Sequence, residues 1–129
     1  MKPETWLKKP KKQVEKYLTK LFNKRIRERD CPDGHFKCIS CGKFKDESQL
    51  NAGHYYHGHK YPALKFDFDN VHGQCVACNL YDHGAAIKYR ENLEKKIGKV
   101  KLEDLDRRSH GSGLDIFEMV ELIKKLKDG

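Results

Sequence analysis

The sequence predicts an α+β fold in which a small metal-clipped core is flanked by a basic N-terminal helix and by C-terminal helices. Two Cys-x-x-Cys pairs, Cys38/Cys41 and Cys75/Cys78, enclose the centre of the chain. Of the 129 residues, 37% are hydrophobic and 36% are charged, so the apolar core is small for the length. A metal clip would supply stability that apolar burial does not. A chain of this length is expected to form one domain.

Within that domain, four consecutive parts are expected. Residues 1–10 read as a basic arm, interrupted by proline, that we expect to be flexible. Residues 11–30 predict an amphipathic helix, because their apolar side chains recur at intervals of three and four. Residues 31–98 contain the metal-clipped core and the helix that follows it. Residues 99–129 are expected to form a C-terminal helical extension.

Short strands and helices are expected in the core and beyond it. The expected strands cover residues 36–39, 50–56 and 70–74. Residues 64–69 alternate apolar and polar side chains, which is typical of a half-buried strand edge. Helices are expected from about Cys78, over residues 85–97, and after a capping box formed by Ser112 and Asp115.

The two cysteine pairs predict a structural Zn²⁺ site. Two thiolates separated by two residues can bind one ion, and two such pairs complete a tetrahedral set. Gly42 follows the first pair and can adopt the positive φ of a tight turn. Residues 42–74 separate the pairs, a longer spacer than the roughly 15–20 residues of a zinc ribbon. A ribbon with a long hairpin and no chemistry is the alternative interpretation.

The use of cysteine and the lack of long apolar segments predict a cytoplasmic protein. Four of the five cysteines belong to the pairs, which suits a reducing compartment better than a disulfide framework does. Cys31 is then expected to be a partly buried free cysteine, with a role as substitute zinc ligand as the less economical alternative. No stretch approaches 18 apolar residues and the N-terminus has no apolar signal segment, so no membrane partner is expected.

The charge distribution points to nucleic acid. The formal net charge is +8, and residues 1–37 hold 12 Lys/Arg against 5 Asp/Glu. A concentrated basic segment beside a metal module favours a polyanionic partner. The residues expected to contact phosphates lie on the polar face of the predicted helix: Lys16, Lys20, Lys24 and Arg27. A solvated helix face without a partner is the alternative.

The residues between the cysteine pairs resemble the HNH, or His-Me finger, nucleases. In that superfamily a His ends one strand, an Asn precedes the next, and an Asn or His opens a helix, sometimes with a second His one turn later. The corresponding residues here are His54, Asn70, Asn79 and His83. The resemblance implies a ββα-metal core, in this chain clipped by zinc and flanked by the basic amphipathic helix and the C-terminal helices. It also implies that Asn79 and His83 share one helix face.

A closer resemblance is to the lambda-type NinG (Rap) family of phage recombination proteins. It is carried by F-N-K-R-I-R-E-R-D, C-I-S-C-G, A-G-H-Y and L-K-F-D-F-D-N-V-H-G-Q-C-x-x-C-N, with Y-R and I-G downstream. These motifs cover roughly residues 20–100. The family implies structure-specific cleavage of branched DNA, such as Holliday junctions and D-loops, in a bacterial host or phage-infected cell.

Phosphodiester hydrolysis assigns a role to each of these residues. His54 suits the general base, because the unperturbed imidazole pKa lies near neutrality. A catalytic Mg²⁺ or Mn²⁺ would be held by Asn79 and His83 and would stabilise the leaving oxygen. Asn70 is expected to brace the loop that orients His54. His57 and His59 are expected to lie in a mobile loop and contact DNA.

One departure from the HNH pattern concerns Gly53. Many HNH nucleases have a metal-binding Asp or His immediately before the catalytic His, and glycine has no side chain to offer. We expect His72 to replace the missing ligand, because alternation along the strand places it on the face opposite Val71. Asp67 and Asp69 are second choices.

Together these observations predict a divalent-metal-dependent HNH endonuclease acting on branched DNA, possibly as a homodimer that cuts both strands. The alternative is a zinc-containing DNA-binding protein whose HNH site is degenerate, with Gly53 as the mark of that loss.

Overall fold

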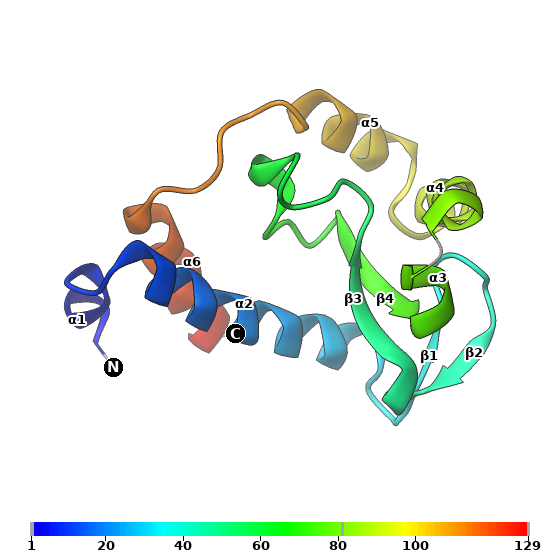
Figure 1. Cartoon of the computed structure of the whole chain (residues 1–129), viewed down its shortest axis with the longest axis horizontal. Coiled ribbons are helices and arrows are strands. Elements are labelled where there is room, and N and C mark those ends of the chain that lie inside the picture. Colours follow the sequence, from blue (N-terminus) through cyan, green and yellow to red (C-terminus); the bar gives the residue numbers. More distant parts are fainter. Residues whose placement is uncertain (1, 81, 129) are drawn as a thin grey trace.

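The computed structural model describes residues 2–80 and 82–128, which contain helices and two small antiparallel sheets (Figure 1). The helices are α1 (Pro3–Leu7), α2 (Lys11–Asp30), α3 (Val76–Leu80), α4 (Asp82–Ile97), α5 (Lys99–Arg108) and α6 (Ile116–Asp128). The strands are β1 (His35–Lys37), β2 (Phe44–Asp46), β3 (Leu50–His54) and β4 (Val71–Cys75). Short 3-10 turns cover Glu47–Gln49 and Pro62–Leu64. None of the described helices is long and apolar enough to cross a membrane.

The amphipathic helix predicted at residues 11–30 is confirmed as α2. Its buried residues are Val14, Leu18, Phe22 and Ile26, spaced by four. This stripe packs with α6 and with Val71 of β4 in one hydrophobic cluster. In Figure 1, α6 lies along the N-terminal half of α2, whereas the β3–β4 hairpin stands near its C-terminal half. Residues from both ends of the chain therefore support the hairpin.

The N-terminal segment differs from the flexible arm expected for residues 1–10. Residues 3–7 form α1, and Trp6 is only 7% exposed. The Trp6 ring stacks on Tyr17 of α2 with a centroid separation of 4.4 Å. Burial of this one large aromatic side chain in the cluster of α2 and α6 fixes the N-terminal segment.

The β3–β4 hairpin lies at the centre of the fold. Its antiparallel register runs from Leu50 opposite Cys75 to His54 opposite Val71. The β1–β2 ribbon joins its edge through a hydrogen bond from the Ile39 amide to the Gly73 carbonyl, 3.0 Å long. Helix α3 begins at Val76, two residues earlier than expected and directly after β4. The order β3, β4, α3 therefore brings the ends of two strands and a helix together.

Residues 64–69 do not form the strand edge that their alternation predicted. They continue from the 3-10 turn at Pro62–Leu64 into further turns. Phe66 and Phe68 still pack on Phe22 of α2, at centroid distances of 5.7 and 4.7 Å. The alternation reflects the two aromatic side chains that pack on α2. The backbone is held in turns, because Asp67 Oδ1 accepts from the Asp69 amide and Asn70 Nδ2 donates to the Leu64 carbonyl.

The C-terminal region is helical as expected, but its capping differs. The amide of Glu118 donates to Asp115 Oδ1 (2.8 Å), and the amide of Asp115 donates to Glu118 Oε1 (3.0 Å). The capping box of α6 is therefore Asp115 with Glu118, and not Ser112 with Asp115. Asp is as good an N-cap as Ser, and here the acidic residue three positions later completes the reciprocal pair.

Candidate active site and zinc centre

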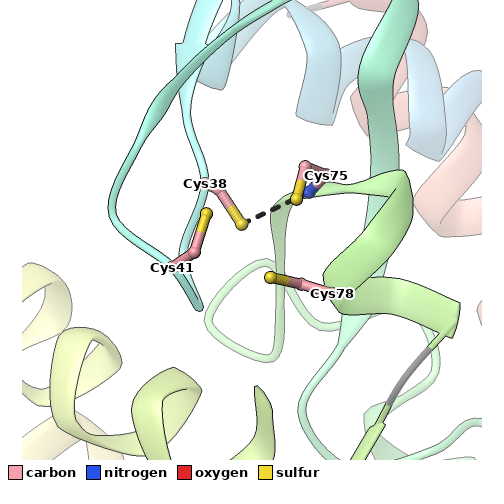
Figure 2. A group of neighbouring side chains, drawn as sticks. All are labelled: Cys38, Cys41, Cys75 and Cys78. Atoms are coloured by element: carbon pink, nitrogen blue, oxygen red, sulfur yellow. Dashed lines mark hydrogen bonds between the residues drawn. The ribbon is translucent and has the colours of Figure 1, made fainter. Parts of the chain in front are cut away.

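The four paired cysteines meet at one point. The Sγ atoms of Cys38, Cys41, Cys75 and Cys78 all lie within 4.8 Å of one another (Figure 2). The first pair lies in the turn after β1, where Gly42 has a φ of 73° and its amide donates to the Cys38 carbonyl (2.9 Å). The second pair spans the end of β4 and α3. Zn–S bonds of about 2.3 Å require Sγ atoms about 3.8 Å apart, so this cluster fits tetrahedral zinc.

The electrostatics of the cluster also favour a cation. Burial tends to raise the pKa of the Cys38 thiol, but backbone N–H groups, beginning with that of Cys75, outweigh it and bring the pKa to about 7. Burial, together with the neighbouring Cys38 charge, raises the pKa of Cys41 and Cys78. Ionisation of the Cys38 thiol therefore disfavours ionisation of Cys41 and Cys78, and a bound Zn²⁺ would reverse this balance.

Cys31 lies outside this cluster of four. It is 5% exposed and packs beside Phe36, Cys38 and Cys75. Burial raises the pKa of its thiol. The fifth cysteine is thus an apolar contact beside the four-cysteine cluster, and it is more deeply buried than the partly buried thiol that the sequence predicted.

His54 ends β3 and is half-buried. Its Nε2 lies 2.8 Å from the carbonyl oxygen of Lys65, and an N–H must be the donor in that contact. The neutral ring therefore carries its proton on Nε2 and presents the Nδ1 lone pair. Burial lowers the pKa of His54, which favours the neutral ring at physiological pH. This is the protonation state that a general base requires.

Asn70 is fully buried and braces the loop opposite His54. Its Oδ1 accepts from the amide of Tyr56 (2.9 Å), and its Nδ2 donates to the carbonyls of Tyr56 and Leu64 (both 3.0 Å). The Leu64 carbonyl belongs to the peptide next to the Lys65 carbonyl that fixes His54. Asn70 thus makes side-chain hydrogen bonds to the loop backbone, as predicted, and one of them reaches the peptide next to the carbonyl that contacts His54.

A pocket of about 270 Å³ opens beside His54. Its lining residues come from β3, β4, α3 and the loop after β3: Ala52, His54, His57, Gly58, His59, Lys65, Gln74 and Asn79. Asn79 was predicted to share a site with His54, and the structure brings the two together. His57 and His59 line the same pocket, which places them at the candidate catalytic centre and not on a remote surface. Their closeness in sequence to His54 was the available signal.

His72 does not belong to this pocket, contrary to the sequence-based expectation that it replaces the missing ligand. It is 1% exposed, its Nε2 donates to the Asp69 carbonyl (2.8 Å), and its Nδ1 accepts from Arg29 Nη2 (3.1 Å). Burial lowers the pKa of His72 to about 3. Both ring nitrogens are engaged inside the fold, so His72 is structural.

Gln74 occupies the space beside Gly53 instead. A Cβ atom built on Gly53 would lie 2.2 Å from Gln74 Oε1 and 2.8 Å from Gln74 Cβ. Position 53 must be glycine because the Gln74 side chain, its diagonal neighbour across the hairpin, crosses it. Gln74 is 4% exposed and lines the pocket with His54 and Asn79. The alternation of β4 could have indicated Gln74, which shares a face with His72.

The other predicted ligands lie near residue 81. Asn79 is an exposed residue of α3. The side chain of His83 lies outside the described residues, and so does the predicted sharing of one helix face by Asn79 and His83, which spans residue 81. The second-choice ligands Asp67 and Asp69 are not among the residues that line the pocket.

The predicted basic face of α2 is exposed, as Lys16, Lys20, Lys24 and Arg27 all lie on the solvent side. The structure adds a second basic site that the sequence did not indicate. A pocket of about 410 Å³ between α2, β1 and α4 is lined by Arg29, Lys37, Lys95 and Lys96, with Asp30 as its acidic residue. These cations come from three segments that the fold brings together.

Asp30 anchors that second site. Burial tends to raise the pKa of its carboxyl, but hydrogen bonds from Arg29, Lys96 and the Gly73 amide hold it well below its usual range. The Gly73 amide lies 2.8 Å from Asp30 Oδ2, and Lys96 Nζ lies 2.9 Å from Asp30 Oδ1. Asp30 therefore joins the end of α2 to β4 and α4.

Comparison with known proteins assigns the family. Residues 3–128 match the family model described as Bacteriophage Lambda NinG protein. The chain belongs to the NinG family. Protein ninG of Escherichia phage lambda is 32% identical over 133 aligned residues, which cover 99% of this chain and 59% of the relative. Protein ninG of Salmonella phage P22 is 33% identical, covering 99% and 60%. Protein ninG of Escherichia phage 933W is 35% identical over 107 residues, covering 82% and 47%.

This NinG chain thus spans about half to three fifths of the length of the relatives that it matches. No solved structure matches it. The family match extends beyond residues 20–100, where the sequence motifs lie, and includes α1, α2, α5 and α6.

Proposed function

We propose that this NinG chain is a divalent-metal-dependent endonuclease that acts on branched DNA. The observation that carries the proposal is the state of His54. Its ring is held by the Lys65 carbonyl with Nδ1 as the basic nitrogen, in a pocket that also contains Asn79. The succession of β3, β4 and α3 around this pocket supports an HNH-type site.

In the proposed reaction, His54 takes a proton from the attacking water at Nδ1. The water oxygen forms a bond to phosphorus as the bond between phosphorus and the leaving oxygen breaks, and the Lys65 carbonyl stabilises the resulting imidazolium through Nε2. Asn70 contributes by positioning, since it holds the backbone next to that carbonyl. The amide oxygen of Asn79 would help hold an Mg²⁺ or Mn²⁺ ion, which supplies Lewis-acid stabilisation of the leaving oxygen when bound.

The described lining residues of the pocket offer the amide oxygens of Asn79 and Gln74 and the imidazoles of His54, His57 and His59, and no carboxylate or thiolate. A hard divalent ion held there by Asn79 would take its remaining oxygen ligands from water and from the phosphates of the DNA. Oxygen ligands suit Mg²⁺ and Mn²⁺, whereas the four-cysteine cluster suits Zn²⁺. The two metals would therefore occupy chemically distinct sites on the same hairpin.

The test is cleavage of a four-way junction by the zinc-loaded chain in Mg²⁺ or Mn²⁺, beside a linear duplex of the same sequence. We expect cleavage of the junction only, and its loss in His54→Ala. His35→Ala is the matched control, since His35 is exposed on β1 and does not line the pocket. If the wild-type chain binds the junction but does not cut it in either ion, the chain is a zinc-containing DNA-binding protein and the nuclease proposal fails.

A further inference from the structure

We propose that the outer face of the β1–β2 ribbon binds single-stranded DNA, with Phe44 stacking on an unpaired base and Lys37 contacting the adjoining phosphates. The inference rests on the proposed function in one respect, since DNA is the partner in both. It concerns a different surface, because the ribbon contributes no residue to the pocket beside His54. Figure 1 shows the ribbon at the periphery of the fold, on the β4 side of the central hairpin.

Phe44 is a large aromatic side chain that the fold leaves in solvent. It is 76% exposed and belongs to none of the hydrophobic clusters formed by the described residues. The alternation of the ribbon explains this, because Phe36 on the inner face is 2% exposed and packs beside Cys38 and Cys75. The inner face therefore serves the core, whereas the outer face, which carries Phe44, is open to a partner.

The ribbon presents the Phe44 ring on a fixed backbone. Beside the four-cysteine cluster, the Cys38 amide donates to the Lys43 carbonyl at 2.9 Å. At the other end of the ribbon, the Glu47 amide donates to the Gly34 carbonyl, also at 2.9 Å. A base that stacks on Phe44 would not have to order a flexible loop, which lowers the entropic cost of binding.

Cations flank Phe44 on the outer face. Lys37 lies directly opposite Phe44 in the register of the ribbon, and Lys43 precedes it in the chain. Both lysines are exposed, and neither forms an ion pair with the residues that the structure describes. The carboxylate of Asp46, on the same face, accepts a hydrogen bond from the Ser48 amide at 2.9 Å.

The cationic surface continues from the ribbon into the basic pocket between α2, β1 and α4. Lys37 lines that pocket together with Lys95 and Lys96. The carboxylate of Asp30 is already paired there, with Arg29 Nε at 2.7 Å and Lys96 Nζ at 2.9 Å. Lys37 and Lys95 are therefore available to the phosphates of a strand whose base lies on Phe44.

An exposed aromatic ring beside cations matches the way in which proteins bind single strands. Unpaired bases stack on aromatic side chains while cationic side chains follow the backbone. Phe117 of α6 provides the contrast. It is 65% exposed, but it lines a pocket that holds three carboxylates against two cations. Charge complementarity therefore selects Phe44, and not Phe117, for a polyanion.

The experiment measures binding of the zinc-loaded full chain to an oligothymidine strand and to a linear duplex, without added Mg²⁺ or Mn²⁺. Phe44→Ala should weaken single-strand binding by about tenfold, the usual contribution of one stacked base, and should leave duplex binding within about twofold. Phe117→Ala is the matched control. Phe44→Trp should retain single-strand binding, and its fluorescence should be quenched by the strand after subtraction of the wild-type signal from Trp6.

A second measurement tests the phosphate contacts. Joint replacement of Lys37 and Lys95 with Gln should flatten the slope of log affinity against log salt on the single strand by up to about 1.4, at about 0.7 for each contact. Zinc content and Tm show that each variant is folded. Because Phe44, Lys37 and Lys95 are all exposed, we expect folding to be retained.

Wild-type single-strand affinity in Phe44→Ala would overturn the inference, as would an equal loss in Phe117→Ala or equal weakening on the duplex. So would a wild-type chain that does not bind the strand. Self-association that Phe44→Ala abolishes, with unchanged single-strand binding, would assign the ring to a second copy of the chain instead.

The outcome is separable from that of the nuclease test. Single-strand binding that depends on Phe44, without cleavage of any junction, would keep this inference and reject the nuclease. Junction cleavage by a chain whose single-strand binding does not depend on Phe44 would do the reverse.

Discussion

His54 and His72 lie on the same two-stranded hairpin, and only one register step separates them. His54 is opposite Val71, and His72 is opposite Gly53, so their side chains leave opposite faces of the hairpin. Burial lowers the pKa of both rings. His54 nevertheless borders an open pocket, whereas His72 is 1% exposed and has both ring nitrogens engaged.

The two rings differ in which of their nitrogens are engaged. One ring nitrogen of His54 is fixed by a backbone carbonyl, which leaves the other as a base beside the pocket. In His72, the second ring nitrogen accepts a hydrogen bond from Arg29, and the ring packs edge-on against Tyr89 with an interplanar angle of 76°. A lowered pKa therefore does not distinguish the proposed general base from the buried histidine, whereas a position beside a pocket does.

The largest expected effect is the loss of the four-cysteine metal site, which would hold the β3–β4 hairpin in place. Replacement of Cys38 with Ser, or removal of zinc with a chelator, should unfold the β1–β4 region, because zinc binding and folding are coupled by about 10 kcal/mol or more in such sites. Zinc content and thermal unfolding measure this. Cys31→Ser, which leaves the four ligands intact, should retain one equivalent of zinc. A Cys38→Ser protein with a full equivalent and a normal Tm would reject the four-cysteine assignment.

The next largest effect is expected in the rate of junction cleavage, which should differ between variants of His54 and of His72. His54→Ala should reduce the rate of junction cleavage by roughly 10² to 10⁴, the usual contribution of a general base, while junction affinity stays within a few-fold. His72→Gln should cut at near the wild-type rate wherever it is folded. Single-turnover cleavage rates test both variants, together with junction binding by zinc-loaded protein in the absence of added Mg²⁺ or Mn²⁺. A His54→Ala chain that cuts normally, or a folded His72→Gln chain that does not, would reverse the two roles.

The β3–β4 hairpin shows which features of the candidate site could be predicted from the sequence and which could not. The alternation of β4 correctly placed His72 on the face opposite Val71, and Val71 does pack on α2. The prediction failed at the next step, because both faces of the hairpin are covered. Every residue of β4 is buried, and the Tyr89 hydroxyl of α4 donates to the Gly53 carbonyl at 2.6 Å. Periodicity identifies residues that share a face, but it does not identify what packs against that face.

The other features of the fold also fall into those that local sequence determines and those that depend on contacts between distant segments. The cysteine cluster, the α2 stripe and the bracing by Asn70 depend on spacing or on local hydrogen bonds, and the sequence predicted all three. Trp6, Gln74 and the basic pocket around Lys37 and Lys95 depend on contacts between distant segments. Local spacing carries no information on such contacts, which is why the flexible N-terminal arm and the place of His72 in the His54 site were predicted wrongly.

A smaller effect concerns stability at low pH. The pKa of His72 is about 3 in the folded chain and about 6.5 when unfolded, so between these values only the unfolded state gains the proton. The free energy of unfolding should therefore fall as pH drops below 6.5, by at most about 1.4 kcal/mol per pH unit. His72→Gln should be less stable than the wild type at pH 7.5 but lose less stability on acidification.

Chemical denaturation of zinc-loaded protein between pH 7.5 and 5 measures this slope. His54→Ala serves as the control, since its half-exposed ring can be protonated in the folded chain at lower cost. Equal slopes for the wild type and His72→Gln would show that His72 accepts a proton without disturbing the fold, and the contrast between the two histidines would then fail.

The smallest expected effect is on the salt dependence of DNA binding, and it tests which side of the hairpin the DNA would approach. Lys65, whose carbonyl fixes His54, pairs through its Nζ with Glu15 of α2 at 2.6 Å, so the His54 pocket adjoins the helix that carries Lys16 and Lys20. Each phosphate contact contributes about −0.9 to the slope of log affinity against log salt on duplex DNA. Replacement of Lys16 and Lys20 with Gln should flatten that slope by up to about twice this value, and should weaken junctions and linear duplexes alike.

The matched control replaces Lys37 and Lys95 with Gln, which removes two exposed charges from the basic pocket on the Asp30 side of the fold. If DNA lies along α2 to reach His54, this pair should change the slope less than Lys16 and Lys20 do. A larger change from Lys37 and Lys95 would move the DNA to the pocket between α2, β1 and α4. An unchanged slope in both variants would show that neither surface touches phosphate.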